Sequence, residues 1–253
     1  MNDGPPKDPI RAAQEAMLRP RIKRFYAQAG VGEAEGGGFA LLLDGKRART
    51  PAKSPLVLPT RALAQVLARE WAGQGETIEI AAMPITRLVT AALDGIALAP
   101  GATRAEIVGY AGSDHLCYRA PEPEALVAAE AAAADPILAW AAQSLNAPFV
   151  VVVGLVHRAQ PDSALAAVRA ELDAVTQPIA LAALLTMTTL SGSALLALAV
   201  ASGRLNAAEA WRAAHVAEDF QTAQWGEDEE AAARRAARWA DFAAAAEALA
   251  ALG

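Results

Sequence analysis

Hydrophobic and polar residues alternate with a period of two near the start of the chain, and this pattern predicts a small antiparallel sheet. Phe39, Leu41 and Leu43 fall on one face of a predicted strand. The Asp44-Gly45 pair that follows is typical of a two-residue type I′ turn, so the chain returns in a hairpin. The glycines at positions 36–38 permit an earlier reversal, which predicts another strand over residues 31–35. Residues 55–59 begin and end with proline and are long enough only for an edge strand.

An amphipathic helix is predicted directly after the sheet. Thr60 is a typical N-cap, and the helix ends at the glycines of positions 73 and 75. Apolar residues recur on one helical face at Leu63, Val66, Leu67 and Trp71. This stripe is expected to pack against the sheet, which places Trp71 in the core and its neighbour Glu70 at the boundary of that core.

From Pro84 onward the pattern is helical almost throughout. Pro84 suits the first turn of a helix that ends near residues 94–95. Further helix starts are predicted at the capping-box pattern Thr103-x-x-Glu106, at the pair Asp135-Pro136 and at the box-like Asn206-x-x-Glu209. Other helices are expected over residues 165–175, 207–225 and 227–249.

These elements predict an α+β fold with two domains. Residues 23–97 form a small N-terminal domain of antiparallel sheet plus helix, and residues 98–253 form a larger, mainly α-helical C-terminal domain. Residues 1–22 are rich in proline, glycine and charge and are expected to be a flexible tail. One segment departs from the helical pattern, because residues 149–156 are β-branched and predict a buried strand. Its partner is either the N-terminal sheet or a local strand.

A long uncharged run raises the question of a membrane. Residues 179–203 contain no charged side chain and exceed the roughly 20 apolar residues that a spanning helix needs. However, the run contains several threonines and serines, and much of the remainder is alanine, so its transfer into lipid is weakly favourable. We therefore interpret it as a helix buried inside a helical domain, without membrane insertion.

Charge and cysteine usage narrow the class of protein. The 253 residues carry a formal net charge of −6, which disfavours nucleic acid as a partner. The single cysteine cannot form an intramolecular disulfide, and the first residues lack the charged-then-apolar layout of a secretory signal. We expect a protein of the reducing cytoplasm.

Common catalytic motifs are missing from the sequence. It has no phosphate-binding G-x-x-x-x-G-K-[ST], no G-x-S-x-G elbow and no H-E-x-x-H zinc motif. The most enzyme-like cluster is Asp114-His115-Leu116-Cys117, which could serve a small-molecule enzyme if folding brought His157 or His215 close to it. We favour a structural role, with Cys117 as a small buried apolar residue and Asp114 as a cap or ion-pair partner.

A second cluster near the C-terminus combines aromatic and acidic residues. Phe220 and Gln221 precede Trp225 and Gly226, and acids occupy positions 227–230. Gly226 is expected to break a helix, and acids at the start of the next helix interact favourably with its dipole. Fewer acids would suffice for capping, so docking of a basic protein partner is an equally good interpretation.

Several segments in register make the chain resemble a known family. They are LLLDGKRARTPAKSPLVLPT, AREWAGQGE, MPITRL, SDHLCYRAP and EDFQTAQWGEDEEA. Together they resemble the assembly chaperone of the F-type ATP synthase α subunit, found in mitochondria and α-proteobacteria. The resemblance runs from about Lys23 to Phe242.

The resemblance implies an ATP-independent, non-enzymatic chaperone without cofactor, most simply a monomer. It would bind the unassembled α subunit transiently and prevent its aggregation until β subunits replace it. The implied partner-binding residues are Glu229, which matches an acidic position that the family needs, and around it Phe220, Gln221, Trp225, Gly226 and Asp228. Trp71, with Glu70, matches a structural tryptophan of the family. Phe220 stands where family members often have an indole, which alters the expected contact geometry. The alternatives are an enzyme that uses His115 and Cys117, or a helical adaptor for another protein.

Overall fold

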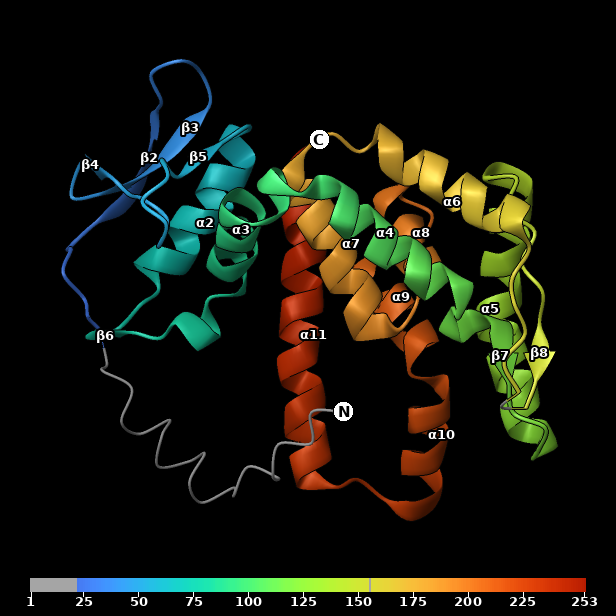
Figure 1. The fold of residues 1–253 in the computed structure, drawn as a ribbon. Coiled ribbons are helices and arrows are strands. Elements are labelled where there is room, and N and C mark those ends of the chain that lie inside the picture. Colours follow the sequence, from blue (N-terminus) through green and yellow to red (C-terminus); the bar gives the residue numbers. More distant parts are fainter. Residues whose placement is uncertain (1–21, 155) are drawn as a thin grey trace, which may run out of the picture.

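The computed structural model describes residues 22–154 and 156–253 (Figure 1). Apart from Ile22, the predicted tail of residues 1–22 lies outside the described residues. The chain is α+β, as predicted: short strands and helices α2 and α3 form the N-terminal part, and a mainly helical part follows. The strands are β1 (Ile22–Lys23), β2 (Ala29–Glu33), β3 (Phe39–Leu43), β4 (Lys46–Arg47), β5 (Val57–Leu58), β6 (Thr77–Ile78), β7 (Tyr118–Arg119) and β8 (Val152–Val153).

The central N-terminal sheet is antiparallel, with the order β2-β3-β4 and with β5 also paired to β3. Asp44 and Gly45 have φ values of 48° and 77°, which confirms the predicted type I′ turn. The Asp44 carboxylate also accepts hydrogen bonds from the backbone N–H groups of Ala27 and Gln28. The glycines at 36–38 all have positive φ and make the predicted reversal, so β2 and β3 pair along their full lengths.

Helices α2 (Arg61–Ala72) and α3 (Pro84–Asp94) form as predicted. The Leu63 N–H donates to Thr60 Oγ1 over 3.2 Å, which confirms the N-cap. The apolar stripe of α2 packs against the sheet, and Leu63 and Leu67 are completely buried there together with Leu41 of β3.

The remaining chain forms the helices α4 (Pro100–Gly112), α5 (Glu124–Ser144), α6 (Asp162–Ala174), α7 (Pro178–Ser191), α8 (Ala194–Ala201), α9 (Ala207–Ala214), α10 (Val216–Trp225) and α11 (Glu229–Ala250). Short 3₁₀ turns, η1 (Ile80–Ala82), η2 (Ile96–Leu98) and η3 (His115–Cys117), occur in the connections. Helix α7 contacts α3, α4, α8 and α11, and nine of its 14 residues are buried.

The N-terminal and helical parts are in direct contact. Thr60 Oγ1 donates to the carbonyl of Ala251 over 2.6 Å, and Arg69 pairs with Glu247 of α11 at 2.8 Å. The α3 side chain Arg87 also pairs with Asp241 of α11. The two parts share an interface. The predicted domain boundary between residues 97 and 98 therefore stays a prediction.

The uncharged run folds as two core helices instead of one. Gly192, with φ 69°, ends α7, and Ser193 Oγ then caps α8 by accepting from the Leu196 N–H over 3.0 Å. Of the described helices, α5 alone is long and apolar enough by itself to cross a membrane, and the bent pair α3–α4 would pass the same criterion as one span. In α5, 22% of the apolar window is buried inside the fold. The absence of membrane insertion stays a prediction.

Of the helix starts predicted at Thr103, Asp135 and Asn206, one is confirmed and two are wrong. The capping box of Asn206 and Glu209 is present, with reciprocal bonds of 2.9 and 2.8 Å. The start at Thr103 is wrong, because Pro100 already supplies a favourable first turn and Thr103 lies buried inside α4. The start at Asp135 is also wrong, because α5 begins at Glu124 and continues through Pro136 while Asp135 pairs with Arg119.

Two further predicted elements are corrected. The helix expected over residues 207–225 is interrupted at His215, which separates α9 from α10. The buried strand expected over residues 149–156 is reduced to β8, which pairs in parallel with β7 and not with the N-terminal sheet. Val151, Val153 and Val156 are exposed, so β-branched composition correctly indicated extended backbone but not burial.

Candidate functional site

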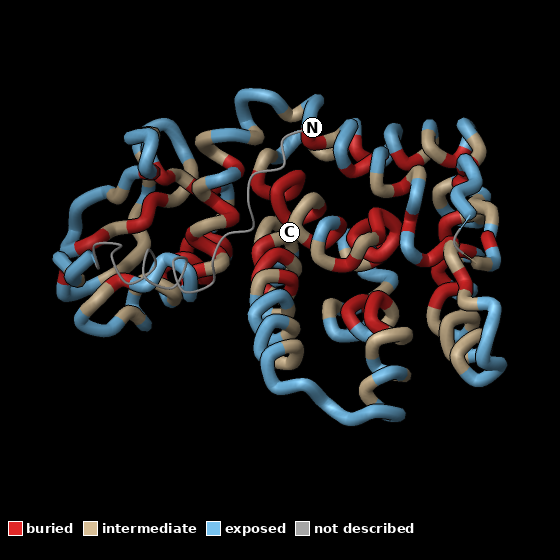
Figure 2. The backbone as a smooth tube through the Cα atoms, turned by 60° about the horizontal axis from the view of Figure 1, so that its bottom comes forward, coloured by how far each residue is buried: buried red, intermediate tan, exposed pale blue. Residues whose placement is uncertain are grey.

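Helix α10 ends and helix α11 begins at a projecting turn, which we call the α10–α11 tip (residues 225–230; Figure 1). Every residue of this tip is exposed, as the colouring of Figure 2 shows for the connection between the two helices. The tip contains Trp225, Gly226, Asp228 and Glu229, so the structure brings together most of the predicted partner-binding residues.

Glycine and aspartate shape the tip. Gly226 has φ 88° and ψ 171°, a conformation that strongly favours glycine, and it ends α10. The Ala231 N–H donates to the Asp228 carboxylate over 2.7 Å, so Asp228 is the N-cap of α11. Glu230 pairs with Arg234 one turn later. Local helix chemistry therefore accounts for Asp228 and Glu230, as the capping interpretation predicted.

Glu229 and Trp225 are left without such an explanation. In the described part of the chain, no hydrogen bond or ion pair engages the Glu229 side chain, although its place in the first turn of α11 suits the helix dipole. The indole of Trp225 is 77% exposed, an unusual position for the largest apolar side chain. Tryptophan is enriched among the residues that dominate binding energy at protein interfaces, so the exposed indole makes the tip a candidate docking site.

Phe220 and Gln221 lie more than one helical turn before the tip. Phe220 is half-buried, since α10 packs along α5, whereas Gln221 is exposed. The two residues therefore border the tip along α10 without belonging to it. The assignment of all these residues to partner binding stays a prediction.

An ion pair and a cluster of rings hold α10 and α11, together called the α10–α11 hairpin, in place. Arg235 of α11 pairs with Asp219 of α10 at 2.5 Å, and this hydrogen bond raises the pKa of Arg235. At the base of the hairpin, Trp211 packs against Trp239 and Phe242 at centroid distances of 5.6 and 5.3 Å. The Asp219–Arg235 contact could not be predicted from the sequence, because the two residues lie on different helices.

His215 lies at the break between α9 and α10. Its ring is buried 4.0 Å from the Trp211 ring, and its Nδ1 lies 2.8 Å from the Trp211 carbonyl. Burial lowers the pKa of His215. His215 therefore serves the packing of this junction.

Glu70 and Trp71 have structural positions away from the tip. The Glu70 carboxylate accepts from the backbone N–H groups of Ile85 and Thr86 over 2.8 and 2.7 Å and from the Thr86 hydroxyl over 2.5 Å. It thereby caps the start of α3 from α2, and its partial burial raises its pKa. Trp71 is half-buried and packs against the core, so its predicted core position is correct only in part.

Asp114 and Cys117 have structural positions as well. The completely buried Asp114 carboxylate accepts from the N–H groups of Leu116 and Leu195, each over 3.1 Å. Cys117 is also completely buried, and its pKa is raised to about 12, mainly by desolvation. A thiol with such a pKa stays protonated and is a poor nucleophile.

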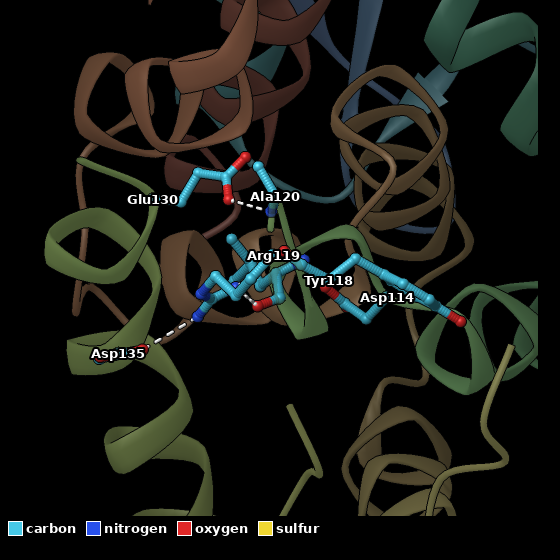
Figure 3. A network of polar contacts seen from close by, with 7 residues as sticks. Asp114, Tyr118, Arg119, Ala120, Glu130 and Asp135 are labelled. Carbon is cyan, nitrogen blue, oxygen red and sulfur yellow. Dashed lines mark hydrogen bonds and ion pairs between the residues drawn. The ribbon is translucent and has the colours of Figure 1, made fainter. Parts of the chain in front are cut away.

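The surrounding polar network fixes the chain between η3 and α5 (Figure 3). The buried guanidinium of Arg119 donates to Asp135 over 2.9 Å and to the carbonyl of Tyr118 over 3.1 Å. The Ala120 N–H donates to Glu130 over 2.7 Å. Arg119 and Glu130 thus hold the β7 segment against α5.

The three histidines are not assembled into one site. His157 lies 3.1 Å from the Tyr118 hydroxyl, while His215 is in the α9–α10 junction. Among residues 22–154 and 156–253, no group of three or more His, Cys, Asp or Glu side chains could hold a metal ion. An enzyme that uses His115 and Cys117 stays an alternative prediction.

Comparisons with known proteins relate the chain to chaperones. The family model described as ATP12 chaperone protein matches residues 23–142. The crystal structure of Atp12 from Paracoccus denitrificans is similar with a TM-score of 0.85 and 40% identity, covering 92% of this chain and 99% of that one. A mutant of the P. denitrificans protein gives a TM-score of 0.84 and 40% identity over 92% and 98% of the two chains.

A solved protein of Agrobacterium tumefaciens is also similar, with a TM-score of 0.90 and 51% identity over 98% of this chain and 92% of that one. Likeness at this level of identity extends over both the N-terminal and the helical part. The chain therefore belongs to the ATP12 chaperone family, a family of assembly chaperones.

Proposed function

We propose that this protein is an ATP-independent chaperone that binds the unassembled α subunit of the ATP synthase and masks its subunit interface until β subunits replace it. Membership of the ATP12 chaperone family supports this proposal. A ring subunit made alone exposes a surface intended for a different neighbour, and such surfaces associate into open aggregates. Covering one such interface suppresses aggregation without any chemical step.

The observation that carries the proposal is the α10–α11 tip. Trp225 offers an exposed apolar anchor, and the Glu229 carboxylate has no partner among the described residues. The Asp219–Arg235 pair and the ring cluster support the hairpin, so little conformational entropy is lost on binding. Because the client must later leave, we expect a partly polar interface of roughly 1,200–2,000 Å². In this proposal the protein acts as a cytoplasmic monomer, without cofactor or catalysis.

Suppression of aggregation tests the proposal directly. Purified α subunit is diluted from denaturant, and light scattering is followed with and without an equimolar amount of this protein. Scattering is expected to fall. Unchanged scattering at equimolar and higher ratios would contradict the proposed function.

Glu229→Lys is expected to weaken binding of the α subunit by about tenfold or more, since a rim charge that faces basic groups is reversed. The free energy of unfolding should stay within about 1 kcal/mol of the parent, because Glu229 is exposed. Titration calorimetry measures the affinity, and urea denaturation measures the stability.

Glu171→Lys is the matched control. Glu171 is an exposed acid on α6, so this substitution makes the same change of charge away from the tip. It should leave the affinity for the α subunit within about twofold. Equal weakening by both substitutions would mean that net charge, and not the tip, determines binding.

A further inference from the structure

Strand β2 is an edge strand, and its outer side presents unpaired backbone groups. At its two ends, the Asp44 N–H donates to the Gln28 carbonyl over 2.9 Å and the Ala34 N–H donates to the Gly38 carbonyl over 3.0 Å. In an antiparallel ladder such bonding residues alternate, so the even-numbered residues of β2 bond to β3. The N–H and C=O groups of Ala29 and Val31 therefore point to the open side. Within residues 22–154 and 156–253, no hydrogen bond engages them.

A groove of about 680 Å³ runs between this open edge and α2, which packs beside β2 in Figure 1. Backbone of β2 forms one wall. The other wall is formed by α2, on which Ala62, Ala68 and Ala72 alternate with the longer side chains of Arg61, Gln65, Val66 and Arg69. A row of unpaired N–H and C=O groups along an open groove suits an extended peptide, which can add to the sheet as another strand. A compact ligand would leave these backbone groups unpaired.

The charges on the groove indicate the kind of peptide. Arg61 and Arg69 are the charged side chains that line it, and both are exposed, in a chain of net charge −6. Their present partners are Glu33 at 3.5 Å and Glu247 at 2.8 Å, also exposed. Exposed ion pairs contribute roughly 0–1 kcal/mol, so an incoming carboxylate can replace them at little cost.

The spacing of the two arginines refines this expectation. Arg69 follows Arg61 by eight positions on one helix, which separates their Cα atoms by about 12 Å along the axis. A strand rises about 3.4 Å per residue and alternates faces, so two acids four residues apart on one face of the peptide match this distance.

We propose that the groove between β2 and α2 binds an extended, acidic segment of the client, which pairs with β2 through backbone hydrogen bonds. This inference rests on the proposed function, because it gives the same client a second point of attachment. A second copy of this chain is a poorer occupant. Two-fold pairing of β2 with β2 would bring the arginines of one copy toward those of the other.

Hydrogen exchange of the full-length protein with purified α subunit tests the inference. In the complex, the amides of Ala29 and Val31 should exchange at least about tenfold more slowly, because they become hydrogen-bonded. Protection of these amides that depends on the concentration of this protein alone would point to a second copy and overturn the inference.

Ala62→Trp tests the groove by filling it. The substitution should weaken binding of the α subunit by about tenfold, a factor equivalent to about 1.4 kcal/mol. Ala166→Trp places the same side chain at an exposed alanine of α6 and should leave affinity within about twofold. The double substitution Arg61→Glu with Arg69→Glu should weaken binding as strongly as Ala62→Trp. Thermal melting verifies that each variant is folded.

The outcomes separate the two proposals. If the α subunit binds while the β2 amides stay unprotected and Ala62→Trp retains full affinity, this inference is wrong and the proposed function stands. If the parent protein does not bind the α subunit, both are wrong. Should Ala62→Trp fail to fold, the protection of β2 in the parent complex decides the question.

Discussion

Replacing Trp71 by arginine is expected to lower the free energy of unfolding by about 3–5 kcal/mol, the range of a large core truncation. The Trp71 ring packs 5.6 Å from the ring of Tyr26, and the Tyr26 hydroxyl donates to the Trp71 carbonyl over 2.7 Å. Arg24 already stacks 4.7 Å over the same tyrosine, so a second guanidinium adds repulsion between like charges. Urea denaturation followed by circular dichroism measures the loss.

Trp225→Arg makes the same chemical change at an exposed position and serves as the control. Because the Trp225 ring is mostly in solvent, its replacement should change the free energy of unfolding by less than about 0.5 kcal/mol. It should instead weaken binding of the α subunit. A loss of stability below about 1 kcal/mol for Trp71→Arg would show that the indole at position 71 does not support the core.

The features predicted correctly from the sequence depend on contacts between near neighbours. The turn at Asp44-Gly45, the cap at Thr60 and the capping box at Asn206 each involve residues within about four positions of one another. Pro84 likewise begins a helix through its own fixed φ. Such elements are visible in a single sequence because no distant residue is needed to form them.

Two of the wrong predictions arose where a residue distant in the sequence decided the local structure. Asp135 has the chemistry of an N-cap, but its carboxylate is used by Arg119, and α5 starts earlier. In residues 149–156, only Val152 and Val153 pair with β7, and Val151, Val153 and Val156 are exposed while Val152 is buried. Hydrophobic periodicity shows which residues share a face of a helix or strand, but it does not show which face packs against another element.

The candidate site was predicted where it depends on residues close together in the sequence. A helix break at Gly226 and capping of the next helix by the acids that follow are local and were predicted, and the structure shows Asp228 as the N-cap. The break and the cap place Trp225 and Glu229 at one tip. The Asp219–Arg235 pair needs two helices to meet, so the sequence could not indicate it. The groove beside β2 escaped prediction for the same reason, because it exists only after α2 packs along an open strand edge.

Asp114 is expected to make stability depend on pH in the direction opposite to an ordinary paired carboxylate. Desolvation by burial raises its pKa in the folded protein to about 6, and the backbone N–H groups of Leu195 and Leu116 oppose that shift without cancelling it. The folded state therefore binds a proton more tightly than the unfolded state, whose pKa is about 3.9. Stability from this group is fully present below the unfolded value and is lost as the pH rises through about 6.

Asp114→Asn removes this titration while keeping the shape of the side chain. One amide oxygen still accepts a backbone N–H, but the amide nitrogen faces the second N–H, so the variant is less stable than the parent at pH 4. Between pH 4 and pH 7 the parent loses its advantage by about 2 kcal/mol, because pH 4 lies at the unfolded pKa and the full equivalent of two pKa units, about 3 kcal/mol, is reached only at lower pH. Urea denaturation of both proteins across this range measures the difference.

Asp162→Asn, at an exposed aspartate of α6, is the control. Its difference in stability from the parent should stay constant with pH within about 0.5 kcal/mol. A difference for Asp114→Asn that is flat, or that grows with pH, would mean that the buried carboxylate is ionised in the folded protein throughout this range.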